Sequence, residues 1–147
     1  VYWDRFKVLR DFVQNLYDAL QWPEWERRFS YSLVDGTLTL NAADVGFSYE
    51  WLLHIGASTK RGDSTGFAGH FGEGFKIASL CALRDHRWHI SLRSRDWTLD
   101  VTTAELKVDG HSLQSLAYAI TREPGSRPDT ELRIAPFQDR ELLNDVL

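Results

Sequence analysis

Apolar residues near the start of the chain recur every three or four positions, at Phe6, Leu9, Phe12, Val13, Leu16, Tyr17 and Leu20. This spacing predicts an amphipathic helix from Asp4 to about Leu20, which Pro23 ends. Apolar and polar residues then alternate over Phe29–Val34 and again over Thr37–Leu40, on either side of Asp35-Gly36. Alternation around an Asp-Gly pair predicts a β-hairpin.

Helical spacing returns in Ser48–Ile55 and Phe71–Leu83, and the polar, glycine-bearing stretch Gly56–Gly69 between them predicts a mobile loop. Five strand-like segments follow, before a last helix over Phe137–Leu147. They are Trp88–Arg93, Thr98–Thr102, Glu105–Val108, Ser115–Thr121 and Thr130–Ile134, with a turn at Asp109-Gly110 and a loop over Glu123–Asp129.

Helices followed by a run of strands favour an α+β fold. We expect a two-layer α/β sandwich, with the helices on one face of a mostly antiparallel sheet. The length of 147 residues suits one domain, 1–147. The chain contains no methionine, which suggests a domain excised from a longer protein.

The composition is that of an ordinary globular protein, with 43% apolar and 26% charged residues. The net charge of −4 gives no electrostatic case for a nucleic-acid or membrane surface, and no apolar run is long enough to span a membrane. A local basic face remains open, because Arg84, Arg87, Arg93 and Arg95 interleave with Trp88 and Trp97; a solvated strand face beside core tryptophans is the simpler interpretation. The single cysteine, Cys81, excludes an internal disulfide and is compatible with a cytoplasmic protein.

Gly66, Gly69, Gly72 and Gly74 lie on a predicted loop that runs directly into a helix. Glycines let backbone N–H groups approach an anion closely, and a helix N-terminus adds partial positive charge. The segment is therefore a candidate phosphate cradle. A flexible connector with a glycine cap is the alternative.

Asp11, Asn15 and Asp18 share one stripe of the first predicted helix, because they stand at positions i, i+4 and i+7. A carboxylate one turn from a carboxamide can hold a water and a divalent cation, and Mg²⁺ keeps water and phosphate ligands beside few protein oxygens. A solvated helix face is the alternative.

Together, these two segments resemble the GHKL ATPases. Asp11–Ala19, within a segment of about residues 5–20, is similar to the N box of that family, Glu-x-x-x-Asn-x-x-Asp-Ala. Gly69-His70-Phe71-Gly72-Glu73-Gly74-Phe75, within residues 69–76, is similar to its final glycine box, G-x-F-G-x-G-F. That form of the box is typical of the branch with heat-shock chaperones, MutL proteins and MORC ATPases.

Three further segments fit the same order. Residues 38–47, which end in Gly46-Phe47, stand where the first glycine box is expected, and Gly56-Ala57-Ser58-Thr59-Lys60 resembles the start of an ATP lid over about residues 56–68. Thr130, on the predicted strand 130–134, matches a threonine that borders the adenine pocket. The resemblance implies a Bergerat-type fold, with ATP and Mg²⁺ as cofactors.

The resemblance also implies a role for each matching residue. Asp11 is the catalytic candidate that orients or deprotonates the attacking water, and Asn15 is the Mg²⁺ ligand. The nucleotide-binding candidates are Asn15, Asp18, Ala19, Asp44, Gly46, Phe47, Ser58, Lys60, Gly69, His70, Phe71, Gly72, Gly74, Phe75 and Thr130.

The chain departs from the family pattern at two places. Asp11 stands where the family has Glu, which is one methylene longer. In the first glycine box, an alignment on Gly46 puts Ala42 in the place of the adenine-reading Asp and Asp44 in the place of a glycine. In a shortened alternative alignment, Asp44-Val45-Gly46 is itself the Asp-x-Gly element.

The function expected from the resemblance is ATP–Mg²⁺ binding with slow hydrolysis and lid closure as a conformational switch. Two alternatives are a non-hydrolysing, nucleotide-gated or nucleotide-free interaction scaffold and, less favoured, a histidine-kinase catalytic domain. The resemblance also implies a homodimer that forms through a flanking transducer domain, and we expect no membrane partner.

Overall fold

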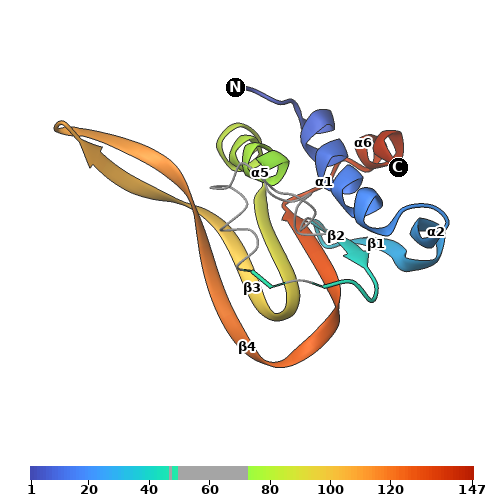
Figure 1. The fold of residues 1–147 in the computed structure, drawn as a ribbon. Helices are drawn as coiled ribbons and strands as arrows, with labels where there is room; N and C mark the ends of the chain where they lie inside the picture. Colours follow the sequence, from blue (N-terminus) through green and yellow to red (C-terminus); the bar gives the residue numbers. More distant parts are fainter. Residues whose placement is uncertain (47, 50–72) are drawn as a thin grey trace.

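The computed structural model describes residues 1–46, 48–49 and 73–147 (Figure 1). The expected helix Ser48–Ile55, apart from its first two residues, and the expected loop Gly56–Gly69 lie outside this part.

The first helix, α1 (Arg5–Leu20), is confirmed. Asp4 caps it, because its Oδ1 accepts a hydrogen bond from the Lys7 N–H at 2.8 Å. The helix ends at Leu20, as predicted, but Pro23 is not the residue that ends it. Gln21 already takes a positive φ of 60°, and Pro23 precedes a second short helix, α2 (Glu24–Arg28), which was not expected.

The predicted hairpin is also confirmed, as strands β1 (Phe29–Val34) and β2 (Thr37–Ala42). Its two turn residues, Asp35 and Gly36, have φ values of 52° and 78°. Left-handed conformations at both positions match the twist of paired strands, and an Asp-Gly pair adopts them readily.

The remaining strand-like segments join into two long strands, β3 (His89–Val108) and β4 (His111–Ala135), connected by the predicted turn at Asp109-Gly110. The stretch Glu123–Asp129, predicted to be a loop, belongs to β4. Register shifts on either side of Arg95 interrupt the pairing there, so extra residues are accommodated as a bulge.

The four strands form one antiparallel sheet in the order β1-β2-β4-β3, so the molecule has an α+β fold. Helices α1, α5 (Glu73–His86) and α6 (Arg140–Val146) lie on the same side of this sheet in Figure 1. The core forms between them, where Leu40, Leu92 and Leu132 of the strands meet Phe12 and Leu16 of α1, all fully buried.

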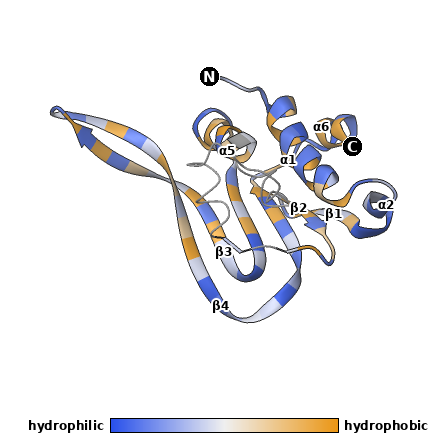
Figure 2. Cartoon of the chain, viewed as in Figure 1, coloured by the Kyte–Doolittle hydropathy of each residue, from blue (hydrophilic) through white to orange (hydrophobic). Residues whose placement is uncertain are grey.

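The opposite face of the sheet is polar. At its centre, the Glu131 carboxylate forms ion pairs with Arg93 at 3.1 Å and with Arg133 at 2.9 Å. Figure 2 shows the resulting alternation of apolar and polar residues along β3 and β4. One buried face and one polar face are the usual pattern for an antiparallel sheet covered on one side.

Beyond the sheet, β3 and β4 continue as a two-stranded ribbon that ends at Asp109-Gly110 (Figure 1). We call residues 103–116 the arm. Its exposed apolar side chains are Leu106, Val108 and Leu113, each about half exposed.

Candidate functional site

The candidate site is built on α1, where Asp11 and Asn15 stand one turn apart. Asn15 is buried, with only 7% of its surface exposed, and its Nδ2 donates a hydrogen bond to Asp11 Oδ2 at 3.2 Å. The helical spacing predicted from the sequence therefore brings the two side chains into contact. Among the described residues, no donor is bonded to the Asn15 carbonyl oxygen, which leaves a hard ligand of the kind that Mg²⁺ prefers.

The environment of Asp11 makes its carboxyl group more basic. Burial raises its pKa above the ordinary value of 3.8, the hydrogen bond from Asn15 and the charge of Lys7 lower it, and the charge of Asp18 raises it. The net effect is upward. A raised pKa favours a carboxylate that takes up a proton, as a general base does.

Helix α5 approaches Asp11 at the end of the glycine segment. A methyl group built on Gly74 would lie 3.1 Å from both carboxylate oxygens of Asp11, which is tighter than nine in ten Cβ contacts in proteins. The next residue, Phe75, is fully buried and its ring centroid lies 5.9 Å from that of Phe12. Thus α1 and α5 are packed so that the first turn of α5 faces the Asp11–Asn15 pair, and a helix N-terminus favours negative charge.

The segment after β2, Ala43–Gly46, is held by side chains from three other elements. Arg28 donates to the carbonyls of Ala43 (2.8 Å) and Asp44 (2.7 Å). Asp129 accepts from the Asp44 N–H at 3.0 Å, and Arg95 donates to the Gly46 carbonyl at 3.3 Å.

Asp44 itself is exposed and has a φ of 58°. That left-handed conformation favours glycine, so it fits the alignment in which Asp44 takes the place of a family glycine. Ala42, in the place of the adenine-reading Asp, is fully buried.

Thr130 lies beside this segment and is fully buried. Its hydroxyl donates to the Val45 carbonyl at 2.7 Å and is 2.9 Å from Ser94 Oγ. A methyl group on Gly46 would come within 3.1 Å of Ser94 Oγ. Gly46 and Thr130 therefore both lie against the Ser94 hydroxyl.

Two candidates on α1 lie further from this centre. Asp18 is half-buried and its Oδ1 accepts a hydrogen bond from Gln14 Nε2 at 2.8 Å, while Ala19 packs against the core. The other nucleotide-binding candidates lie outside the described residues. They are Phe47, Ser58, Lys60, Gly69, His70, Phe71 and Gly72.

The sequence reasoning missed three residues that hold the candidate site, namely Arg28, Arg95 and Asp129. Each of them binds a backbone group of Ala43–Gly46 from a distant part of the chain. Arg95 also has a positive φ of 48°, which a bulge between β3 and β4 imposes. No signal in the sequence marks these contacts, because they depend on strand pairing.

The alternative of a nucleic-acid face with stacking tryptophans finds no support in the described residues. Trp88 and Trp97 are buried, with 4% and 1% of their surfaces exposed. A base cannot stack on a ring that the core already covers.

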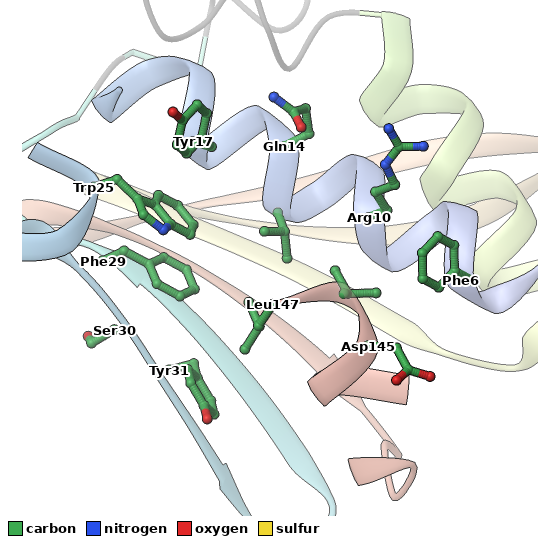
Figure 3. Close-up of a pocket in the computed structure, with 12 residues that line it drawn as sticks. Phe6, Arg10, Gln14, Tyr17, Trp25, Phe29, Ser30, Tyr31, Asp145 and Leu147 are labelled. Atoms are coloured by element: carbon green, nitrogen blue, oxygen red, sulfur yellow. The ribbon is translucent and has the colours of Figure 1, made fainter. Parts of the chain in front are cut away.

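A separate groove of about 800 Å³ opens between α1, α2, β1 and α6 (Figure 3). Aromatic rings from three of these elements line it. The Trp25 ring stacks on Phe29 with centroids 3.9 Å apart, and Tyr17 meets Trp25 edge-on with centroids 5.3 Å apart. The Tyr31 ring is tilted against Phe29, with centroids 6.3 Å apart.

Comparison of the sequence with protein-family models and with curated proteins finds no match. None of the helices in the described ranges has the length and apolar character needed to cross a bilayer. Within the same ranges, no three His, Cys, Asp or Glu side chains gather as a metal site.

Proposed function

We propose that the chain is a nucleotide-binding domain of the GHKL type, which binds ATP with Mg²⁺ and hydrolyses ATP slowly. In this proposal the fold is a two-layer, Bergerat-type sandwich, the protein is cytoplasmic, and closure of residues 56–68 over the nucleotide acts as a switch.

One observation carries the proposal. Gly74, in the first turn of α5, lies against the Asp11 carboxylate, which is bonded to the buried Asn15 amide. The first turn of a helix, a carboxylate and a carboxamide are thus gathered at one point from segments about sixty residues apart in the sequence. A helix N-terminus favours phosphate, and Mg²⁺ takes oxygen ligands of this kind.

The residues fit the proposed cofactors. The Asn15 carbonyl oxygen would ligate Mg²⁺, which supplies charge neutralisation on the phosphates. Asp11 would orient the attacking water and accept its proton, and its raised pKa suits that task. Gly46 would border the base, the buried Thr130 would hold the neighbouring Val45 carbonyl in place, and the backbone of Gly74 would face the phosphates.

Calorimetric titration with ATP–Mg²⁺ tests the proposal. Asn15→Ala should remove the Mg²⁺-dependent part of the affinity, while Arg10→Gln, at an exposed position on the same helix, should leave it unchanged. Because Asn15 is buried, its loss also lowers stability by about 1–2 kcal/mol, so both variants are checked for folding by circular dichroism. If the folded Asn15→Ala variant binds ATP–Mg²⁺ as well as the parent, the assignment is wrong.

A non-hydrolysing module is the second candidate, and the buried Ala42 favours it. A methyl group at that position offers no hydrogen-bond acceptor to a base. Binding without phosphate release would identify a nucleotide-gated switch. Absence of binding to both ATP–Mg²⁺ and ADP would identify a nucleotide-free scaffold.

A further inference from the structure

The outer edge of β1 pairs with no other strand in the part of the chain that the structure describes. The edge strand of a sheet presents a row of unpaired N–H and C=O groups, and proteins usually protect it with charged residues, proline or a bulge. β1 has none of these protections. Its sequence, Phe-Ser-Tyr-Ser-Leu-Val, contains no charge and no proline, and its register with β2 has no shift.

The phase of the hydrogen bonds shows which residues face outward. The Ala43 N–H donates to the Arg28 carbonyl at 2.9 Å, just beyond the paired residues Phe29 and Ala42. Hydrogen-bonded and non-hydrogen-bonded pairs alternate along an antiparallel ladder. The even-numbered residues of β1 are therefore bonded to β2, and the backbone groups of Phe29, Tyr31 and Leu33 point away from it.

The side chains at this edge are also open to a partner. Tyr31 is 45% exposed and, with Phe29 and Leu33, lies on the helix-covered side of the sheet, where it lines the aromatic groove of Figure 3. A strand added at the edge would cover Tyr31 and close the open side of that groove.

We propose that a second copy of this chain adds at this edge, by antiparallel pairing of β1 with β1 about a twofold axis. Symmetry requires that one residue faces itself, and pairing all three outward residues, Phe29, Tyr31 and Leu33, makes it Tyr31. Phe29 then lies opposite Leu33 of the second copy, and the two sheets join into one with all helices on the same side.

Charge favours this pairing. Arg27, whose side chain is exposed and ion-paired with Glu24, precedes the strand and Asp35 follows it. In an antiparallel pair, the start of one strand lies beside the end of the other, so Arg27 of each copy approaches Asp35 of its partner. The uncharged strand between them places no like charges opposite each other. Of the three outward residues, Phe29 already uses one backbone group inside its own chain, because its N–H donates to the Trp25 carbonyl. It therefore offers only its carbonyl group to the second copy.

Cysteine cross-linking tests the register. Residues opposite each other in a hydrogen-bonded pair have Cα atoms about 5.5 Å apart, within disulfide range. Tyr31→Cys should therefore form a disulfide-linked dimer on oxidation. Ser32→Cys is the matched control: its two Cα atoms would be roughly 8 Å apart, too far for a disulfide. The parent protein, whose one cysteine is the buried Cys81, shows how much disulfide-linked dimer forms without an introduced cysteine.

Sedimentation equilibrium tests the dimer itself. The parent should be a dimer at high micromolar concentration. Tyr31→Lys, which puts two like charges on the axis, should raise the dissociation constant at least about a hundredfold. Leu106→Lys, an equally exposed apolar position on the arm, should leave the constant unchanged.

Three results would each overturn the proposal: a monomeric parent, equal cross-linking of both cysteine variants, or dissociation by Leu106→Lys rather than Tyr31→Lys. The last would place the interface on the arm. A parent that remains monomeric but binds an extended peptide at the same edge would replace the second copy by a different partner.

Discussion

Two opposing effects act on the Asp11 carboxylate, and burial is the stronger. The hydrogen bond from Asn15 and the charge of Lys7 favour the ionised form, whereas removal from water disfavours it. The pKa of Asp11 in the folded protein is therefore above its ordinary value of 3.8. A raised carboxyl pKa means that ionised Asp11 reduces the free energy of unfolding.

This shift predicts the pH dependence of an Asp11→Asn variant. Below 3.8, Asp11 is protonated in both the folded and the unfolded chain, and the two proteins should differ little. As the pH rises through the raised pKa, only the parent acquires a buried charge and loses stability. At pH 7 the variant should therefore melt at a higher temperature than the parent. Thermal melts from pH 4 to pH 7 measure the difference in melting temperature between variant and parent. If the variant gains no stability relative to the parent as the pH rises, the prediction is wrong.

Base discrimination depends on the residues around Gly46. Ala42 carries no acceptor, the Thr130 hydroxyl is donated to the Val45 carbonyl, and Asp44 is exposed. If the chain binds nucleotide, ATP and GTP affinities should lie within about tenfold, or ~1.4 kcal/mol. Competition binding measures the ratio in the parent and in Asp44→Ala. A strong preference for ATP that disappears in Asp44→Ala would instead make Asp44 the adenine reader.

The contact between α1 and α5 depends on the absence of a side chain at Gly74. Near the start of a helix, alanine is otherwise favoured over glycine by up to about 1 kcal/mol. Here an added methyl group would meet both Asp11 oxygens at 3.1 Å. Helix propensity and packing therefore predict opposite effects of the same substitution.

A double-mutant cycle separates these two effects. Gly74→Ala should lower the free energy of unfolding by about 1–3 kcal/mol in the parent, because packing is the larger effect. In an Asp11→Ala background, the same substitution should be neutral or stabilising. Denaturant unfolding gives the four free energies, and the coupling between the sites is the measured quantity. Equal effects in both backgrounds would show that the two helices are not packed through this pair.

On the scale of the whole molecule, the arm adds little to the core. Leu106, Val108 and Leu113 are exposed, and residues 103–115 lie outside the core. A two-stranded ribbon without a further layer has little stability of its own. We therefore expect the arm to contribute little to the stability of the fold.

Shortening the arm tests this interpretation. Deletion of residues 105–108 and 111–114 moves the turn Asp109-Gly110 next to Ala104 and Ser115, which already face each other across the ribbon. Because four is an even number, removing four residues from each strand keeps every remaining side chain on its original face and preserves the hydrogen-bonding pattern. The shortened protein should keep its circular dichroism spectrum and melt within about 4 °C of the parent, a change of less than ~1 kcal/mol. A large loss of stability would show that the arm supports the core.

The local elements were predictable from the sequence because short-range chemistry determines them. Asp4 caps α1, the apolar spacing of α1 matches its buried face, and Asp35-Gly36 supplies the two left-handed residues of the hairpin turn. The contact between Asp11 and Asn15 was predictable for the same reason, since residues four apart on a helix are neighbours. The ligand-binding roles of these residues stay predictions.

The lengths of β3 and β4 were not predictable in the same way. Five separate segments and a loop were expected where two long strands form, because Pro124, Gly125 and Pro128 are typical of loops. In the folded protein these three residues have no partner in the β3–β4 register: Arg95 takes a positive φ, the register shifts on either side of it, and they lie in a bulge through which β4 continues. The pairing on both sides of this bulge joins segments that local preference separates.

The sequence by itself therefore determined helix α1, the β1–β2 hairpin and the polar groups that share a face of α1, because these depend on residues a few positions apart. Only the tertiary structure decided that Gly74 meets Asp11, that Arg28, Arg95 and Asp129 hold Ala43–Gly46, and that the β1 edge pairs with no other described strand. Those contacts join residues far apart in the chain. They form because apolar faces of separate elements are buried together, and no local pattern records which faces will meet.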